Sequence, residues 1–325
     1  MPPEAGGILF VHAHPDDESV GTGGTIARCI AEGRRVDLVT CTDGAQGEVH
    51  DSDLDPEEAQ PRLAQIRADE LACSVAALGG GALRLHKLGY RDSGMMGTEG
   101  NDDPLCFWHC DIEEAVGRLV AIVRQARPAV IASYDENGNY GHPDHINAAR
   151  IAREAYEAAA DPHRYPDAGP AHEVDRYYEI AFNRDGWFRL LTEMRERGIK
   201  LPWYFDEALE VEDAPATPAA DELNPSNAEA LRQVGEQLEE GKEPPEGFGT
   251  PEEQITTFID VGPYTDAKRR SMACHRTQSQ DMGWMLDLPD DLAQRVLSPE
   301  YFVLRRWRGR DIPADLREEG LFPAP

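Results

Sequence analysis

The chain has few basic residues and no long apolar run, and each shortage excludes a class of function. Lys and Arg number 32 against 61 Asp and Glu, which gives a formal net charge of −29 at pH 7. Binding to a nucleic-acid backbone or to an anionic membrane requires clustered Lys and Arg. No uninterrupted apolar run approaches the ~20 residues of a membrane span. We therefore expect neither a nucleic-acid nor a membrane partner, and the acidity indicates a highly solvated surface.

The sequence also lacks the cysteine pattern of a disulfide framework and the pattern of a secretory signal. Its six cysteines are scattered through 325 residues, a length that supports a substantial core without cross-links. Cys29, Cys41 and Cys73 lie in apolar patterns that are typical of small core residues. No basic segment followed by an apolar one occurs at the N-terminus. We expect a cytoplasmic protein, and the sequence leaves a homo-oligomer open.

Strand and helix patterns alternate through the first half of the chain. Short apolar or alternating runs predict four strands, at residues 9–11, 35–41, 83–88 and 129–132. Helical periodicity predicts long helices at residues 62–78, 111–125 and 146–160. Strands alternating with helices at this spacing indicate βαβ units. The sequence thus predicts an α/β fold with a Rossmann-like, mostly parallel sheet flanked by helices.

Two stretches rich in His and Asp follow predicted strands of this sheet. The first is AHPDDE at residues 13–18, directly after the first strand. The second is YGHPDH at residues 140–145, after the fourth strand. Ligands of open α/β sheets bind at the carboxyl ends of the strands, where both stretches are expected. Taken alone, the first stretch is equally typical of an acidic turn that only caps the next helix.

Together the two stretches contain the groups of a catalytic metal site. A catalytic zinc commonly takes three protein ligands and leaves the fourth position to water. His14, Asp17 and His145 would supply two imidazoles and one carboxylate. Asp16 is then free to take the proton of the water, because its side chain diverges from that of Asp17 in an extended turn. Asp144 could orient a ligating histidine, since such imidazoles normally donate their other N–H.

The same stretches resemble the LmbE-like/PIG-L zinc-dependent de-N-acetylases, which remove an acetyl or acyl group from an amino sugar. Shorter stretches are similar to the branch of that family that handles mycothiol. This branch contains N-acetyl-glucosaminyl-inositol deacetylases and mycothiol S-conjugate amidases. The shorter stretches lie at residues 39–42, 47–49, 91–95, 134–135 and 275–278. The similarity is dense over residues 7–155 and sparse afterwards, apart from residues 268–278 and the late strand.

The resemblance implies a role for each residue of the two stretches. By it, His14, Asp17 and His145 bind one Zn²⁺ per chain, with Fe²⁺ as the alternative ion, and Asp16 is the general base. His142 and Tyr140 would polarise the carbonyl or donate a proton. As a cation, His142 could stabilise an oxyanion or protonate the leaving nitrogen.

Other residues would face the sugar or inositol by the same resemblance, and each has a structural alternative. Glu48 and Asp92 are expected to contact the substrate, or else to be turn residues. Arg67 is expected to contact the substrate, or else to pair with Glu70 one helical turn away. His275 is interpreted either as a substrate contact or as a core histidine that bonds to backbone.

The second half of the chain is less regular. Strands are predicted at residues 175–182, 256–259 and 301–305, and a helical piece at residues 268–277. Residues 206–253 are rich in Asp, Glu, Pro and Gly, and we interpret them as an acidic surface insertion or lid. We divide the chain into a Rossmann-like catalytic half, 1–165, and a smaller C-terminal portion, 166–325, that completes the substrate cleft.

Three functions remain as hypotheses. The first is a zinc-dependent hydrolase that removes the N-acetyl group from an N-acetylglucosamine conjugate, N-acetyl-glucosaminyl-inositol. The second is an S-conjugate amidase that cleaves a larger acyl-glucosamine amide. The third is a nucleotide-binding module, prompted by Gly21, Gly23 and Gly24. These glycines lack the G-x-G-x-x-G spacing, and the neighbouring acids would repel a pyrophosphate.

Overall fold

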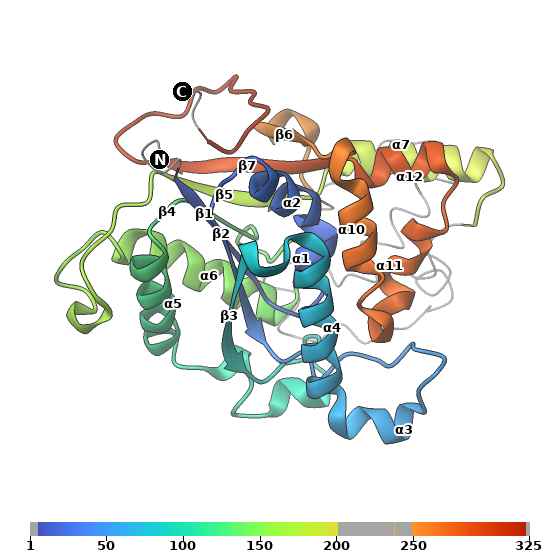
Figure 1. The fold of residues 1–325 in the computed structure, drawn as a ribbon, viewed down its shortest axis with the longest axis horizontal. Coiled ribbons are helices and arrows are strands. Elements are labelled where there is room, and N and C mark those ends of the chain that lie inside the picture. Colours follow the sequence, from blue (N-terminus) through green and yellow to red (C-terminus); the bar gives the residue numbers. More distant parts are fainter. Residues whose placement is uncertain (1–5, 201–236, 238–248, 323–325) are drawn as a thin grey trace.

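The computed structural model describes residues 6–200, 237 and 249–322. One seven-stranded sheet, in the order β3-β2-β1-β4-β5-β7-β6, crosses the molecule (Figure 1). Five strands are parallel: β3 (Leu83–Tyr90), β2 (Val36–Thr42), β1 (Gly7–His12), β4 (Pro128–Ser133) and β5 (Arg176–Ala181). At one edge β7 (Pro299–Trp307) runs antiparallel to β5, and β6 (Thr257–Asp260) runs antiparallel to β7. The predicted Rossmann-like, mostly parallel sheet is confirmed.

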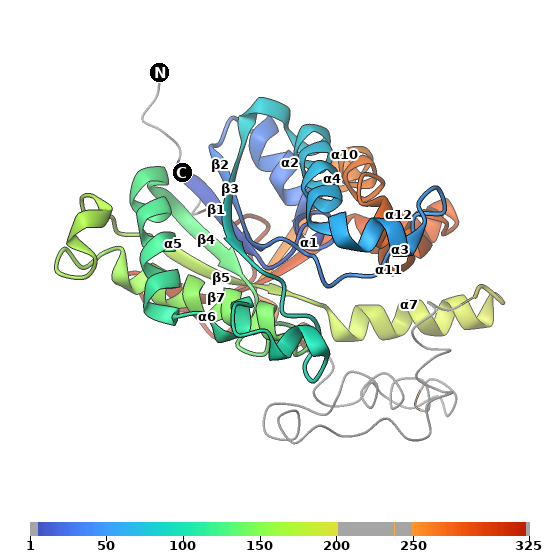
Figure 2. The same ribbon diagram turned by 90° about the horizontal axis from the view of Figure 1, so that it is seen from below.

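Helices cover both faces of the sheet, which explains why the central strands are apolar throughout. Successive side chains of a strand point to opposite faces. Leu9 and Val11 of β1 therefore pack under α5 (Ile112–Ala126) and α6 (Pro143–Ala158). Ile8 and Phe10 pack under α2 (Gly23–Ala31) and α4 (Leu63–Leu78) on the other face. Figure 2 shows the two helical layers, with α10 (Thr265–Met272) beside α2 and α4.

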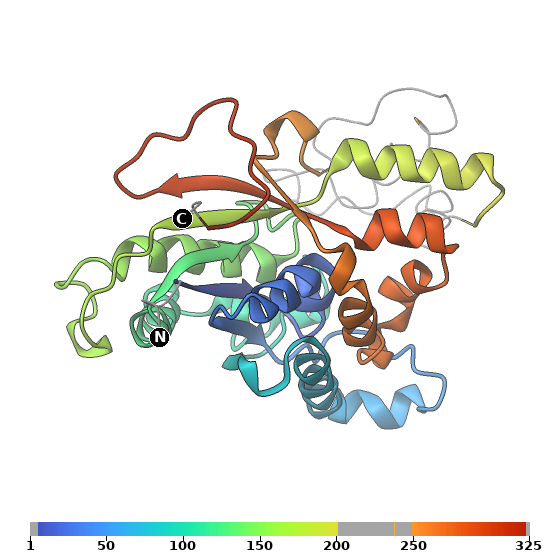
Figure 3. The ribbon, with the colours of Figure 1, turned by 45° about the horizontal axis from the view of Figure 1, so that its top comes forward.

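The C-terminal portion does not form a separate sheet, because β5, β7 and β6 continue the sheet of the first half. Its helices α7 (Arg184–Glu196), α11 (Ser279–Leu286) and α12 (Asp290–Leu297) gather beyond the end of β5 and the start of β7 (Figure 3). Leu191 of α7 and Leu292 of α12 belong to one small core. Two shorter helices, α1 (Asp17–Gly21) and α3 (Pro56–Ala59), follow β1 and β2.

The acidic insertion predicted at 206–253 lies outside the described residues, except for residues 237 and 249–253. Among the described residues, no helix combines the length and the apolar character needed to cross a bilayer.

One prediction about the cysteines is wrong. Cys73 is not a core residue but is exposed on α4, and it forms a disulfide with Cys274, 201 positions later. The Cα atoms of the two residues are 5.7 Å apart, within the usual range for a disulfide. Cys29 and Cys41 are buried free thiols, as predicted. Scattered cysteines in a sequence do not reveal a pair that only the packing of α4 against α10 brings together.

Candidate active site

The loops after β1 and β4 meet in the middle of the sheet. These strands are neighbours, and the strand order reverses between them. In open α/β sheets such a reversal leaves a crevice at the carboxyl ends of the strands. A cleft opens here, and residues of both His- and Asp-rich stretches line it, together with residues of the loops after β2 and β3. The topology therefore brings the two stretches together although about 130 residues separate them.

His14, Asp17 and His145 converge on one point in the cleft. Their ligand atoms all lie within 4.8 Å of one another. His145 Nε2 lies 3.2 Å from His14 Nδ1 and 3.4 Å from Asp17 Oδ1. Bonds of zinc-ligand length in a tetrahedral arrangement would place the ligand atoms about 3.3 Å apart. The donor set therefore fits a single divalent ion, and this His/Asp cluster could bind a metal.

A second carboxylate orients the first histidine. His14 Nε2 lies 3.2 Å from Asp144 Oδ2, while its Nδ1 faces the cluster. Asp144 is fully buried, and both the backbone N–H and the hydroxyl of Ser93 donate to it. A histidine that donates through Nε2 keeps the Nδ1 lone pair for a cation. The geometry thus agrees with the orienting role expected for Asp144.

Asp16 points away from Asp17 and is held in an unusual conformation. Its φ is 122°, a value that residues with a side chain rarely adopt. Such a conformation costs about 1–3 kcal/mol and persists only where the surroundings fix it. Here the backbone N–H of Asp16 donates to Glu18 Oε2 at 3.0 Å, and Arg67 Nη2 donates to Asp16 Oδ2 at 2.7 Å. Burial raises the pKa of Asp16 to about 7, against the opposing effect of the Arg67 guanidinium. A cation held by Asp17 would favour the ionised form of Asp16.

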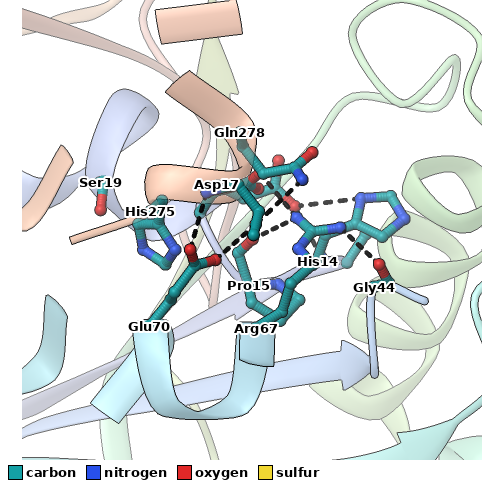
Figure 4. Close-up of polar contacts among 12 residues, drawn as sticks. His14, Pro15, Asp17, Ser19, Gly44, Arg67, Glu70, His275 and Gln278 are labelled. Atoms are coloured by element: carbon teal, nitrogen blue, oxygen red, sulfur yellow. Dashed lines mark hydrogen bonds and ion pairs between the residues drawn. The ribbon is translucent and has the colours of Figure 1, made fainter. Parts of the chain in front are cut away.

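Arg67 joins the loops after β1 and β2. It reaches from α4 between Pro15 and Gly44 and donates to the carbonyl oxygens of both (Figure 4). Gly44 has a φ of +68°, and a Cβ there would lie 2.5 Å from Arg67 Nη1, so the close approach requires glycine. Arg67 lines the cleft, but its guanidinium is engaged by Asp16 and these carbonyls. We therefore revise its role from substrate contact to support of Asp16.

The alternative predicted for Arg67, an ion pair with Glu70, is not formed either. Glu70 instead accepts from the backbone N–H and the hydroxyl of Thr277, at 2.7 and 2.6 Å.

His142 presents a proton donor to the cleft. It caps the N-terminus of α6, where its Nδ1 accepts from the backbone N–H of Asp144 at 3.1 Å. In the neutral ring the proton must then be on Nε2. Burial, reinforced by the charges of His14 and His145, holds the pKa of His142 well below its usual value. The lowered pKa favours the neutral ring, which donates from Nε2, over the cation that we expected, and the role of His142 in the reaction stays a prediction.

Tyr140 also faces the ligand cluster. Its hydroxyl lies 3.3 Å from His145 Nε2, and 44% of the residue is exposed. The hydroxyl is thus at the mouth of the cleft, within reach of a molecule that approaches the cluster.

Of the residues predicted to contact the substrate, Glu48 and Asp92 line the cleft and His275 does not. Glu48 lines the cleft with a side chain that is 79% exposed, where a ligand can reach it. Asp92 also lines the cleft, but it is buried and accepts from the backbone N–H groups of Gln46 and Gly94. His275 does not face the cleft at all, since it is fully buried and does not line it. The expected contact of His275 with substrate is therefore not met.

His275 is the core histidine of the alternative interpretation, but the partner of its Nε2 is a carboxylate rather than backbone. Its Nε2 lies 2.8 Å from Glu18 Oε1. Burial opposes the charge on both residues, but their mutual attraction outweighs it. The attraction lowers the pKa of Glu18 to about 2 and raises the pKa of His275.

Sequence reasoning missed three residues that shape the site. Glu18 bonds the backbone of Asp16, and Ser93 holds Asp144. The ring of Tyr134 stacks on His145 with a centroid separation of 4.2 Å, and its hydroxyl accepts from the backbone N–H of Ala13. All three lie in the stretches 13–18, 91–95 and 134–135, so the family resemblance was the only signal that could have found them.

The sheet and the cluster at its point of reversal define a class: Rossmann-like proteins with the groups for metal-dependent hydrolysis. The family model described as "PIG-L: GlcNAc-PI de-N-acetylase" matches residues 9–156. A 1D-myo-inositol 2-acetamido-2-deoxy-alpha-D-glucopyranoside deacetylase of Geodermatophilus obscurus is 38% identical over 97% of this chain and 96% of its own length. The protein of that name from Streptomyces avermitilis is 38% identical over 96% of both chains. The chain belongs to the LmbE-like/PIG-L family of de-N-acetylases.

Solved structures agree with the fold. N,N'-diacetylchitobiose deacetylase from Pyrococcus horikoshii matches with a TM-score of 0.52 and 18% identity, over 92% of this chain and 83% of that one.

Proposed function

We propose that the protein is a metal-dependent hydrolase that removes the acetyl group from 1D-myo-inositol 2-acetamido-2-deoxy-α-D-glucopyranoside and releases acetate and the free amine. The convergence of His14, Asp17 and His145 beside Asp16 carries the proposal. The names of relatives that are 37–38% identical over nearly the whole chain support the substrate. The S-conjugate amidase is not favoured, because these relatives are named deacetylases. The cytoplasmic location, the oligomeric state and the absence of nucleic-acid and membrane partners stay predictions.

Each side chain of the site then has a task in amide hydrolysis. A Zn²⁺ or Fe²⁺ ion, when bound by His14, Asp17 and His145, would lower the pKa of a water and polarise the carbonyl. Asp16 takes a proton from the attacking water, and it can return this proton to the leaving nitrogen. His142 donates from Nε2 to the oxygen on which negative charge develops, and the Tyr140 hydroxyl is a second donor. Arg67 holds the carboxylate of Asp16 in place.

We expect His142→Ala to lower kcat by about 10²–10³-fold, the usual effect of removing one donor to a developing oxyanion. The metal content should stay near that of the parent protein, because His142 is not one of the three converging ligands. Steady-state kinetics and elemental analysis of the same preparation measure both quantities. Equal losses of turnover and metal would show instead that His142 is a ligand.

The deacetylase and the amidase differ in the room that they need beyond the scissile carbonyl. We expect the rate to fall by at least about tenfold when a bulky acyl group replaces acetyl on the same glucosaminyl-inositol, since a site shaped for acetyl excludes it. Comparing kcat/KM for the two substrates measures the effect. A preference for the bulky substrate would favour the amidase, and full activity in excess chelator would contradict both hydrolases.

A further inference from the structure

Glu18 holds the turn that carries Asp16. The residue is fully buried, and its Oε2 accepts the backbone N–H of Asp16. Its other oxygen, Oε1, accepts from His275 Nε2 at 2.8 Å and from the hydroxyls of Ser74 and Ser19. His275 and Ser74 lie far from Glu18 in the sequence, and Ser19 follows it directly. The position of the Glu18 carboxylate therefore depends on these three partners. Because Asp16 has a positive φ, it keeps its conformation only while such contacts persist.

The two distant partners of Glu18 are joined covalently by their neighbours in the chain. Ser74 follows Cys73 on α4, and His275 follows Cys274 in the turn after α10. The Cys73–Cys274 disulfide therefore links the two residues that precede Ser74 and His275, and so joins the two segments that bond to the carboxylate of Glu18. The hydroxyl of Ser271, on α10, also bonds those of Ser74 and Ser19 in the same place.

The segment after the disulfide, residues 275–278, also bonds to the loop after β2, which lines the cleft. Thr277 donates to Glu70 of α4, and its carbonyl oxygen accepts from the backbone N–H of His50 at 2.9 Å. Gln278 Nε2 donates to the carbonyl oxygen of Glu48 at 2.8 Å. In Figure 4 His275 and Gln278 lie on the same side of Arg67 and Glu70, above α4. Residues 274–278 thus contact both the Asp16 turn, through Glu18, and the loop that bears Glu48.

We propose that Glu18 and His275 are positioning residues for Asp16, and that the Cys73–Cys274 disulfide is a thiol-sensitive clamp that holds them. The proposal rests on the proposed hydrolysis, in which Asp16 is the base. Cys73 is exposed and Cys274 is half-buried, so the disulfide lies at the surface, where a small thiol can approach it. Opening the disulfide leaves residues 274–278 held to α4 without a covalent link. The hold of Glu18 on the Asp16 turn weakens, while the contact of Asp16 with Arg67 remains.

The opening step needs two molecules of a low-molecular-weight monothiol. The thiolate of the first attacks Sγ of Cys73, the sulfur–sulfur bond breaks, and Cys274 leaves as a thiolate that takes up a proton. The second thiolate attacks the sulfur of the small thiol in the mixed disulfide and releases Cys73 as a thiol. The two small thiols are oxidised to their disulfide, and the protein disulfide gains two electrons and two protons.

The test compares the oxidised protein with protein treated with 2-mercaptoethanol. Amide hydrogen exchange is followed by mass spectrometry in peptides covering residues 13–20 and 44–55. We expect exchange in both peptides to rise on reduction, and kcat for the glucosaminyl-inositol substrate to fall by about tenfold with a smaller change in KM. Reoxidation should restore both. Unchanged exchange and kcat in fully reduced protein would overturn the proposal.

Matched cysteine variants separate the clamp from other effects of the thiol. The Cys73→Ser/Cys274→Ser double variant should show the raised exchange and lowered kcat without any thiol, and should not respond further to it. Cys110→Ser removes a free thiol instead and should respond as the parent does. A loss of activity in the double variant on adding thiol would indicate removal of metal and would count against the clamp.

A pair of variants at His275 tests the positioning role directly. His275→Gln keeps an N–H donor for Glu18, whereas His275→Leu does not. We expect the Gln variant to retain most of kcat, and the Leu variant to match reduced protein in kcat and in exchange of residues 13–20. Equal activity of both variants would overturn the role of His275. If oxidised protein releases no acetate while exchange still responds to thiol, the proposed function fails and the clamp stands.

Discussion

Asp16→Asn should lower kcat by about 10²–10⁴-fold, the range that a positioned general base contributes. Asp16 lines the cleft without belonging to the ligand cluster, and Arg67 holds its carboxylate there. Asn is close in size, tolerates positive φ better than most residues, and can still accept a hydrogen bond from Arg67. The loss would therefore report the missing base rather than a displaced turn.

The metal content distinguishes this role from coordination. Asp16→Asn protein should bind as much metal as the parent, because its side chain points to Arg67 while that of Asp17 points to His14 and His145. Elemental analysis beside single-turnover kinetics measures both. Loss of the metal from the variant would show that Asp16 is a ligand. Asp16→Ala should lose as much activity, and in addition some stability, because Ala at a positive φ loses the contact with Arg67 as well.

The sequence predicted the first half of the fold well, because there the apolar residues of each strand and helix are also the residues that the fold buries. The parallel strands are short apolar runs because helices cover both faces, and α4, α5 and α6 have aliphatic residues at helical spacing. The helix α7 was missed. Its sequence begins with an Asn183 cap and has Gly186 in the first turn, and its apolar residues face only a small local core. Such a helix depends on tertiary contacts more than on its own pattern.

The ligand cluster could be predicted from the sequence because its residues lie in two short stretches that follow neighbouring strands. The roles of Arg67 and His275 could not, because they depend on which way a side chain points from a helix or a turn. Arg67 reaches back to the turn 51 positions earlier, and His275 reaches Glu18 from 257 positions away. Their partners are set by the packing of α4 and α10, and no local pattern records that packing.

His145→Ala should abolish metal binding and lower turnover by at least about 10³-fold, since two remaining ligands hold a divalent ion poorly. His145 Nε2 lies within 3.4 Å of a ligand atom of both His14 and Asp17. Its removal therefore takes away one of the three groups that would surround the ion. His142→Ala is the matched control, because His142 caps the same helix three residues before His145 and its ring packs against the same cluster.

Thermal unfolding provides a readout for His145→Ala that does not depend on catalysis. A ligand that binds only the folded state raises Tm by mass action. Added Zn²⁺ should therefore raise the Tm of metal-free parent protein and of His142→Ala, and should leave the Tm of His145→Ala unchanged. A Tm of His145→Ala that rises with zinc as the parent's does would place the ion elsewhere, and His14 and Asp17 would then need a different third ligand. If only the parent and His142→Ala respond, His145 belongs to the metal site and His142 does not.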